Sequence, residues 1–391
     1  MAPCPRRDDP PEDMAARLVP AAVARPRTRF PPLALIVLAV ALLAGCAQPA
    51  ASTLSAETAA APSLVPLEAT AATIPSPEAP TLTPTQVPPT PDPSPTANTS
   101  GRVHLAAVGD LMLGRTIGKR ILNQGAQVPF AGVASVLRMA DITVGNLECA
   151  MGSGGTVQRK YYTFLAPPEA AQALAHGGLD ILNLANNHAL DHGTATLAET
   201  LQLLSANGMR AVGAGLTQSE AYGPLLVEVN GLRIAFLGRV NIPVELTEFD
   251  TRSWAAVGNT PGVAWGEPSE VRSAVRAAKA QADVVVLLLH SGWEMVMAPP
   301  SEERVLAQAA IDAGASLVLG THSHLIQPID TTRPGTLIAY GLGNFVFDEF
   351  DGGATDSAIL HVELTRAGVE SFSWQPVEIQ SGFPVLVTPT P

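Results

Sequence analysis

Short apolar runs alternate with segments of helical periodicity along most of the chain after residue 101. The apolar runs are residues 103–108, 142–144, 181–184, 284–289, 317–319 and 337–339. Apolar positions recur at helical spacing in residues 131–140, 168–176, 194–207, 268–282 and 301–313. Strands that are apolar at nearly every position are buried on both faces, so the pattern predicts an α/β fold whose sheets are covered by helices.

Two pairs of apolar runs have no helical segment between their members. These pairs are residues 225–229 with 232–237, and residues 358–364 with 371–378. The first pair is separated only by Asn230 and Gly231, a dipeptide typical of a tight hairpin because both residues tolerate a positive φ. We therefore expect mixed sheets, with antiparallel strands beside parallel ones, in one domain over residues 101–391.

The first hundred residues differ in composition from the rest. They hold more than half of the 35 prolines but a single glycine, Gly45. An apolar run at residues 31–44 follows three arginines. It is too short for a membrane-spanning helix and is typical of a secretory signal. The run leads into Leu43-Ala44-Gly45-Cys46, which resembles the lipobox of bacterial lipoproteins.

The resemblance to a lipobox implies that residues 1–45 are a signal peptide and that Cys46 is lipid-modified after cleavage. Residues 46–100 are rich in Pro, Thr and Ala without a regular period, so we expect a disordered linker. The domain would then be lipid-anchored to the membrane on the extracytoplasmic side of the cell envelope. An ordinary signal peptide or anchor with an incidental cysteine is the alternative. The acidic stretch before Arg17 is unusual for a signal, which leaves Met14 as a second candidate start.

Charge and cysteine content narrow the classes of function. The chain carries 35 acidic and 23 basic side chains, for a formal net charge of −12. This balance argues against a nucleic-acid partner, because a general nucleic-acid binder has a basic surface. Once the signal is removed and Cys46 is modified, Cys149 is the one thiol left, so no intramolecular disulfide is expected. We expect Cys149 to be a small buried residue rather than a nucleophile.

Polar side chains gather where the apolar strands are predicted to end. They include Asp110, Glu148, Asn187, His188, Asp191, His290, His322 and His324. In open α/β sheets, ligands bind outside the carboxyl ends of the strands. Asp, Glu, Asn and His together suit borderline divalent metals such as manganese, iron or zinc. Each residue taken alone could stabilise a turn, cap a helix or pack in the core. Their repeated occurrence at the predicted carboxyl ends of strands favours a metal site.

Five of these segments resemble motifs of the poly-γ-glutamate capsule biosynthesis family (CapA type), which is similar to the calcineurin-like metallophosphoesterases. The matching segments are residues 109–115, 146–148, 183–188 with Asp191 and Gly193, 320–324 with Gln327 and Pro328, and 340–348. The resemblance implies a four-layer, metallophosphoesterase-like α/β sandwich with a phosphoesterase-type metal site. It also implies a role in exporting or anchoring anionic poly-γ-glutamate, with membrane capsule-synthesis proteins as partners.

The resemblance leaves two functions open. As a hydrolase, the protein would use one or two divalent ions to activate a water molecule toward a phosphoester or an amide. The predicted ligands of these ions are Asp110, Glu148, Asn187, His290, His322 and His324. Arg115 would stabilise anionic charge, and His188, hydrogen-bonded to Asp191, would be the general acid. The alternative is a non-catalytic accessory or polymer-anchoring subunit, which Met112 favours because phosphoesterases carry a histidine at that position.

Overall fold

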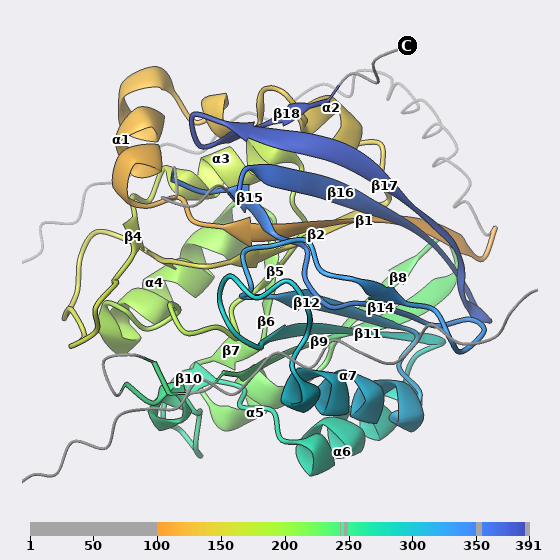
Figure 1. The fold of residues 1–391 in the computed structure, drawn as a ribbon. Helices are drawn as coiled ribbons and strands as arrows, with labels where there is room; N and C mark the ends of the chain where they lie inside the picture. The colour runs from red at the N-terminus through yellow and green to blue at the C-terminus, as the bar shows by residue number, and fades with distance from the viewer. Residues whose placement is uncertain (1–99, 243, 246–248, 349–353, 388–391) are drawn as a thin grey trace, which may run out of the picture. The chain divides into compact units, whose positions relative to one another are not determined.

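Two β-sheets lie face to face, and helices cover the outer face of each (Figure 1). The computed structural model describes residues 100–242, 244–245, 249–348 and 354–387. This order of layers, helix then sheet then sheet then helix, confirms the predicted α/β sandwich with mixed central sheets. The predicted signal peptide, Cys46 and the predicted linker, apart from Ser100, lie outside the described residues. Within those ranges, no helix is long and apolar enough to cross a membrane.

The first sheet contains eight strands and is parallel in its middle. Its order is β18 (Phe383–Leu386), β17 (Gly368–Gln380), β16 (Asp356–Thr365), β1 (Arg102–Leu111), β2 (Ile142–Leu147), β5 (Ile181–Asn183) and β6 (Arg210–Val212), with β15 (Asn344–Val346) paired to β1. The neighbours from β1 to β6 are parallel, as is β15, whereas β16, β17 and β18 are antiparallel. The late antiparallel pair predicted from the sequence is confirmed as β16 and β17.

The second sheet contains six strands. Its order is β13 (Ile329–Asp330), β14 (Leu337–Ala339), β12 (Leu317–Thr321), β11 (Val284–Ser291), β9 (Leu232–Asn241) and β8 (Leu225–Val229). The inner strands are parallel and the two edge strands are antiparallel to their neighbours. β8 and β9 form the predicted hairpin, and Asn230 and Gly231 adopt φ angles of 52° and 77°. Two short pairs are separate from both sheets: β3 (Ala150–Met151) with β4 (Leu165–Ala166), and β7 (Ala214–Gly215) with β10 (Gly262–Val263).

Helices of the two outer layers pack on different sheets (Figure 1). The first sheet packs against α1 (Arg115–Gln124), α2 (Ala134–Leu137), α3 (Ala170–Gly177) and α4 (Gly193–Ala206). The second packs against α6 (Pro268–Lys279) and α7 (Ser301–Ala313). The remaining helical segments are α5 (Gln218–Tyr222) and the 3₁₀ turns η1 (Val128–Phe130) and η2 (Thr251–Trp254).

Strand periodicity divides the apolar core into layers. In β11, Val284 and Val286 belong to the core between the sheets, whereas Val285 and Leu287 pack beneath α6 and α7. Successive residues of a strand point to opposite faces, so a strand covered on both sides must be apolar at every position. This burial on both faces explains why residues 284–289 form a continuous apolar run.

Three predictions about single elements were incomplete. β1 continues past residue 108 to Leu111, because Asp110 and Leu111 pair with both β2 and β15. α1 was not predicted: it is amphipathic, but only three of its ten residues are buried. The helix predicted at residues 131–140 is confirmed only over α2. The longer β1 places Asp110 inside the sheet instead of in the following loop.

Candidate metal centre

A row of polar side chains crosses the first sheet at the carboxyl ends of its parallel strands. Asp110 on β1 pairs in register with Asn146 on β2, which pairs with Asn183 on β5. Asn146 Nδ2 donates to Asp110 Oδ1 at 2.9 Å, and Asn183 Nδ2 donates to Asn146 Oδ1 at 3.0 Å. All three residues are buried. The amides therefore fix the Asp110 carboxylate, and its second oxygen faces the loop that follows β12.

The second sheet contributes side chains at the matching edge. His290 on β11 pairs with Thr321 at the end of β12, and its Nδ1 lies 2.9 Å from Thr321 Oγ1. The same nitrogen lies 3.2 Å from Asn146 Nδ2, which connects the two sheets. Asn146 Nδ2 only donates and Asn187 Oδ1 only accepts, so these contacts place the hydrogen of neutral His290 on Nε2. A metal at Nε2 would take the place of that hydrogen, with Nδ1–H then donating to the Thr321 hydroxyl, the usual arrangement of a ligating histidine. Asn187 Oδ1 lies 3.0 Å from this Nε2, so the two predicted ligands adjoin.

The loop after β12 directs two histidines into the same space. His322 and His324 adopt φ angles of 95° and 59°, a left-handed conformation that costs a non-glycine residue about 1–3 kcal/mol. His324 Nδ1 lies 3.3 Å from Asp110 Oδ2 and 2.9 Å from Asn344 Oδ1. The backbone N–H of His322 donates to Asp110 Oδ2 at 3.4 Å. Backbone strain of this kind is concentrated at functional sites, where the surrounding contacts maintain it.

Five of the six predicted metal ligands form two groups that share Glu148. In each group, Glu148 with His290 and His322, and Glu148 with Asp110 and His324, the donor atoms lie within 4.8 Å of one another. His290 Nε2 lies 4.0 Å and His324 Nε2 lies 3.9 Å from Glu148 Oε1. A carboxylate common to two donor groups can bridge two ions that are about 3.5–4 Å apart. Each donor group therefore offers a position for one metal ion.

Two buried atoms of these groups lack a protein partner. Among the described residues, Glu148 Oε2 and His322 Nδ1 are shielded from solvent and make no hydrogen bond. A buried polar group left unpaired costs about 1–3 kcal/mol, and more when it is charged. A divalent cation would satisfy both atoms, and carboxylates with imidazoles suit manganese, iron or zinc. The residues therefore fit a divalent metal.

Burial shifts the proton equilibria of the cluster. Desolvation, together with the neighbouring Asp110 carboxylate, raises the pKa of Glu148 well above its ordinary value. Burial, with the other histidines nearby, holds the pKa of His290 well below its usual range and lowers the pKa of His322 to about 3. Burial acts to lower the pKa of His324, but the hydrogen bond and charge of Asp110, together with the charge of Glu294 and the contact with Asn344, raise it. His290 and His322 are thus neutral near pH 7, the form in which histidine binds a metal.

A second network of hydrogen bonds brings His188 and Asp191 together. His188 Nδ1 lies 2.6 Å from Asp191 Oδ2, which also accepts the backbone N–H of Phe164 at 2.7 Å. The Phe164 ring stacks on the His188 ring, with the two centroids 4.2 Å apart. Burial lowers the pKa of His188, although Asp191 acts in the opposite direction. These contacts hold the imidazole in one orientation beside the donor groups.

Lys160 and Glu245 are two charged residues of this network that sequence analysis missed. Lys160 Nζ lies 3.1 Å from Asp191 Oδ1 and 3.3 Å from Glu245 Oε1, and it donates to the carbonyl of Asn187. Glu245 Oε1 accepts from Asn187 Nδ2 at 3.1 Å. The Lys160 side chain is fully buried. Both residues lie in loops without an apolar period, so only tertiary packing reveals them.

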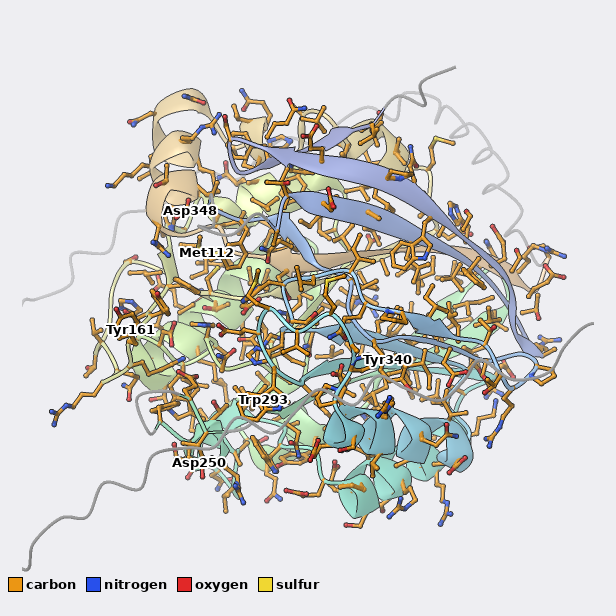
Figure 2. All side chains as sticks on the ribbon, viewed as in Figure 1. Met112, Tyr161, Asp250, Trp293, Tyr340 and Asp348 are labelled. Carbon is orange, nitrogen blue, oxygen red and sulfur yellow. The ribbon has the colours of Figure 1, made fainter. Side chains whose placement is uncertain are left out.

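Arg115, the remaining predicted catalytic residue, lies at the edge of the site and outside both donor groups. It begins α1 with a φ of 48°, and its Nε lies 3.3 Å from Asp348 Oδ2. Figure 2 labels Asp348 and Met112 near this end of α1. Arg115 Cζ lies 5.7 Å from the centroid of Phe164, the ring that stacks on His188. The Arg115 side chain is 51% exposed, so its guanidinium is accessible to an anionic substrate.

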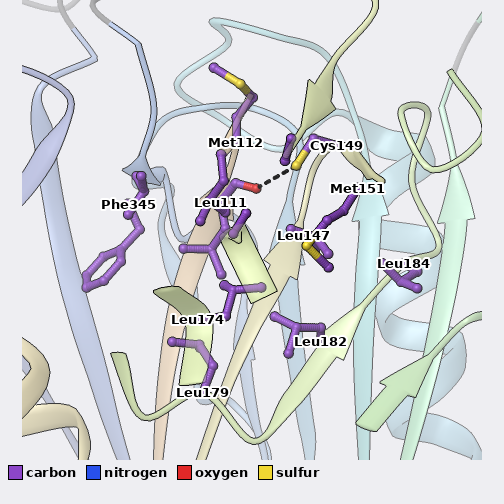
Figure 3. Close-up of a cluster of buried hydrophobic side chains, with 14 of the residues drawn as sticks. Leu111, Met112, Leu147, Cys149, Met151, Leu174, Leu179, Leu182, Leu184 and Phe345 are labelled. Carbon is purple, nitrogen blue, oxygen red and sulfur yellow. Dashed lines mark hydrogen bonds between the residues drawn. The ribbon is translucent and has the colours of Figure 1, made fainter. Parts of the chain in front are cut away.

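Met112 and Cys149 pack in the apolar core instead of joining the donor groups. Met112 is fully buried in the cluster beneath the first helical layer, together with Cys149 and Leu147 (Figure 3). The Cys149 thiol donates a weak hydrogen bond to the carbonyl of Leu111 at 3.9 Å. Burial raises the pKa of that thiol to about 12. The prediction that Cys149 is a small buried residue is confirmed.

Comparison with known proteins gives a family match over most of the described domain. The family model of the bacterial capsule synthesis protein PGA_cap matches residues 104–349. The PGA biosynthesis protein CapA of Bacillus subtilis (strain 168) is 34% identical over 287 residues, which are 72% of this chain and 72% of that one. The capsule biosynthesis protein CapA of Bacillus anthracis is 30% identical over 295 residues, covering 73% and 70%. A Mycobacterium tuberculosis protein described as a probable polyglutamine synthesis accessory protein is 31% identical over 260 residues, covering 63% and 66%.

Proposed function

Since the chain belongs to the PGA_cap family of bacterial capsule synthesis proteins, within the metallophosphoesterase-like superfamily, we propose that it is a metal-dependent hydrolase of poly-γ-glutamate capsule synthesis. One observation supports hydrolysis most strongly: two groups of buried donors share Glu148. A domain with a purely structural role would be destabilised by such a cluster, because burying polar groups without partners costs free energy.

Each donor group would hold one divalent ion, and Glu148 would contribute an oxygen to both. Asn187, whose amide oxygen adjoins His290, would add a ligand to the group of Glu148, His290 and His322. When bound, manganese, iron or zinc polarises a substrate oxygen and lowers the pKa of a water molecule, which enables attack on a phosphoester or an amide. The amides of Asn146 and Asn183 keep the Asp110 carboxylate in position throughout.

His188 would donate the proton that the leaving group requires. Asp191 accepts a hydrogen bond from His188 Nδ1–H, so His188 Nε2 would be the nitrogen that exchanges a proton with the substrate. Because burial lowers the pKa of His188, its protonated form releases the proton readily. Lys160 holds the Asp191 carboxylate in place from the other side. Arg115, at the edge of the site, would pair with anionic charge on the substrate.

The domain would act outside the cytoplasm, lipid-anchored to the membrane through Cys46. The apolar run at residues 31–44 and the lipobox-like sequence that ends in Cys46 support this location. Residues 46–100 would separate the anchor from the folded domain. Its substrate there would be an anionic polymer such as poly-γ-glutamate, and its partners would be the membrane proteins that make the capsule.

A non-catalytic accessory role is the second candidate, and Met112 favours it. Phosphoesterases carry a histidine ligand at that position, whereas Met112 is buried in the apolar core. The mycobacterial relative is described as an accessory protein of polyglutamine synthesis. In this role the same donors would bind a metal or the carboxylates of the polymer without turnover.

Turnover and metal content, measured together, separate the two candidates. The assay supplies Mn²⁺ and tests phosphomonoester, phosphodiester and γ-glutamyl amide substrates. We expect His188→Asn to lower kcat by about 10²–10⁴-fold and to keep the wild-type metal content. The matched control is His176→Asn, since His176 is an exposed histidine on α3. Loss of metal from His188→Asn would contradict the role of His188, and metal binding without turnover of any substrate would favour the accessory role.

A further inference from the structure

The loop between β11 and α7 exposes a run of apolar side chains at residues 293–298. Four of its members are large, apolar and 38–68% exposed: Trp293, Met295, Val296 and Met297. Elsewhere in the described ranges, large exposed apolar residues occur along the chain singly or as one pair of adjacent tyrosines. Single exposed apolar residues are ordinary, whereas a contiguous group of them marks a surface that contacts a partner or a membrane.

Hydrogen bonds hold this loop beside the proposed metal centre. The backbone N–H of Met295 donates at 3.0 Å to the carbonyl of Ser323, which stands between two of the predicted metal ligands. Gln327 Nε2 donates at 2.8 Å to the carbonyl of Val296. Met295 adopts a φ of 57°, a conformation that is unfavourable for a residue other than glycine. The apolar side chains therefore face solvent from a fixed loop, which Figure 2 locates by the label of Trp293 near α7.

The residue types of the loop suit the interface of a lipid bilayer. Tryptophan is enriched at membrane–water interfaces, because its ring is largely apolar and its N–H still finds a polar partner. Methionine and valine gain free energy when their apolar surface leaves water. Glu294 carries the one charge of residues 293–298, and that charge is negative. Burial of apolar surface, not attraction to anionic headgroups, would therefore drive the contact.

The chain that precedes the domain points to a bilayer as the occupant of this surface. The proposed lipid anchor at Cys46 would tether the domain to a membrane through residues 46–100. These residues, about 55 in number, would span about 40 Å as a flexible coil and about 170 Å as an extended Pro-rich chain. Tethering keeps the local concentration of the bilayer high, so even a weak contact of the loop would be populated.

We propose that the loop of residues 293–298 inserts its apolar side chains into the surface of the membrane that carries the anchor. This inference rests on the proposed lipid anchor, and it extends the proposed function. Because the loop is bonded to Ser323, its contact with lipid would hold the metal centre close to the bilayer surface. The polymer would then meet the metal centre where the membrane proteins that make it release it.

Quenching of tryptophan fluorescence by brominated lipids tests this contact. The full chain, produced with its own N-terminal segment, is reconstituted into phosphatidylcholine vesicles with and without bromine on the acyl chains. All four tryptophans lie in the folded domain, so the anchor contributes no signal. Trp293 is exposed, whereas Trp254 and Trp265 are buried and Trp374 is half-buried. We expect Trp293→Phe to lose the bromine-quenched emission and the matched control Trp374→Phe to keep it.

A charge in the loop provides a second test that keeps every tryptophan. Met297→Asp places a carboxylate on the side chain that is 68% exposed, and we expect it to abolish bromine quenching, because a charged group is costly to insert into a bilayer. The matched control is Leu122→Asp, at a 57% exposed position on α1, which should be quenched like wild type. Bromine quenching that survives in Trp293→Phe or in Met297→Asp would overturn the proposal.

Aqueous acrylamide identifies what covers the loop if lipid does not. Quenching of Trp293 by acrylamide alone would show that the loop stays in water, and shielding from both quenchers would indicate that a second copy of the chain covers it. Either result overturns the proposal. Vesicle flotation tests the anchor separately: a chain that floats without bromine quenching refutes the loop contact alone, and a chain that does not float refutes both. No substitution here changes a predicted metal ligand, so turnover is tested independently.

Discussion

Replacing Lys160 by methionine tests the buried network behind the proposed general acid. Methionine keeps the apolar stem of the side chain and removes its charge. Lys160 and Asp191, whose charged atoms lie 3.1 Å apart, both have fully buried side chains. Removing one partner of a buried ion pair leaves the other uncompensated and costs about 3–5 kcal/mol. Asp191 keeps His188 and Phe164 as partners, so we expect the free energy of unfolding to fall by about 3 kcal/mol, the lower end of that range.

The loss of stability should depend on pH through His188. Burial is the main cause of the lowered pKa of His188, and the charge of Lys160 adds to it, so removing Lys160 raises that pKa. Below about pH 6.5, the ordinary pKa of histidine, the unfolded wild-type chain binds a proton that folded His188 resists, and wild type loses stability. In the variant, protonated His188 takes the place of the Lys160 charge beside Asp191. The difference in stability between the two proteins should therefore shrink in acid.

Urea unfolding of the compact unit Pro88–Pro391 measures both effects. The transitions are followed by circular dichroism at about pH 8 and about pH 5, on either side of the ordinary histidine pKa. The matched control is Lys119→Met, an exposed position on α1, which should change stability by no more than about 0.5 kcal/mol. A loss below about 1 kcal/mol for Lys160→Met at the higher pH would refute the buried ion pair, because exposed pairs contribute only that much.

Three further predictions concern single residues. In the hydrolase, kcat should fall as pH rises through the lowered pKa of His188, with a midpoint below about 6.5, and a pH profile without that limb would contradict its role as general acid. The Cys149 thiol, with its pKa raised to about 12, should not react with Ellman's reagent in folded Pro88–Pro391 and should react in denaturant, so rapid reaction in the folded state would contradict its burial. Gly109→Ala would put a Cβ atom 1.8 Å from the Gly343 carbonyl oxygen and should lower stability by about 1–3 kcal/mol or more, whereas the Cβ of Gly154→Ala meets nothing within 4 Å and that variant carries only the backbone strain of its φ of 158°. Equal melting temperatures for these two glycine variants would contradict the close contact of β1 with the Gly343 backbone.

The layers of the fold were predictable because burial on both faces of a sheet imposes a sequence pattern. β11 is apolar at every position from Val284 to Leu289, and the Asn230-Gly231 turn identifies the β8–β9 hairpin. The helix α1 was missed because it buries only Ile117, Gly118 and Ile121. Ile117 and Ile121 keep the helical spacing, but α1 has ten residues, fewer than the window of about 11–18 over which helical periodicity is read.

The donor groups were predictable for a different reason. Asp110, Glu148, His290 and the two histidines after β12 each follow or end an apolar strand, so the sheet itself collects them. Lys160 and Glu245 come from loops whose conformation depends on contacts across the whole site. No local sequence pattern predicts those contacts, so the buried Lys160 is identified only from the structure.

Metal content tests the central claim most directly. Elemental analysis would compare Pro88–Pro391, purified without chelator, with the same unit carrying His322→Ala and His324→Ala, since these two histidines lie in different donor groups that share Glu148. We predict one or two manganese, iron or zinc ions per wild-type chain that are lost or strongly reduced in the double variant, while circular dichroism shows that both proteins are folded. A wild-type protein that holds no metal at this centre even after reconstitution, or a folded double variant that keeps the full complement, would contradict the proposed centre.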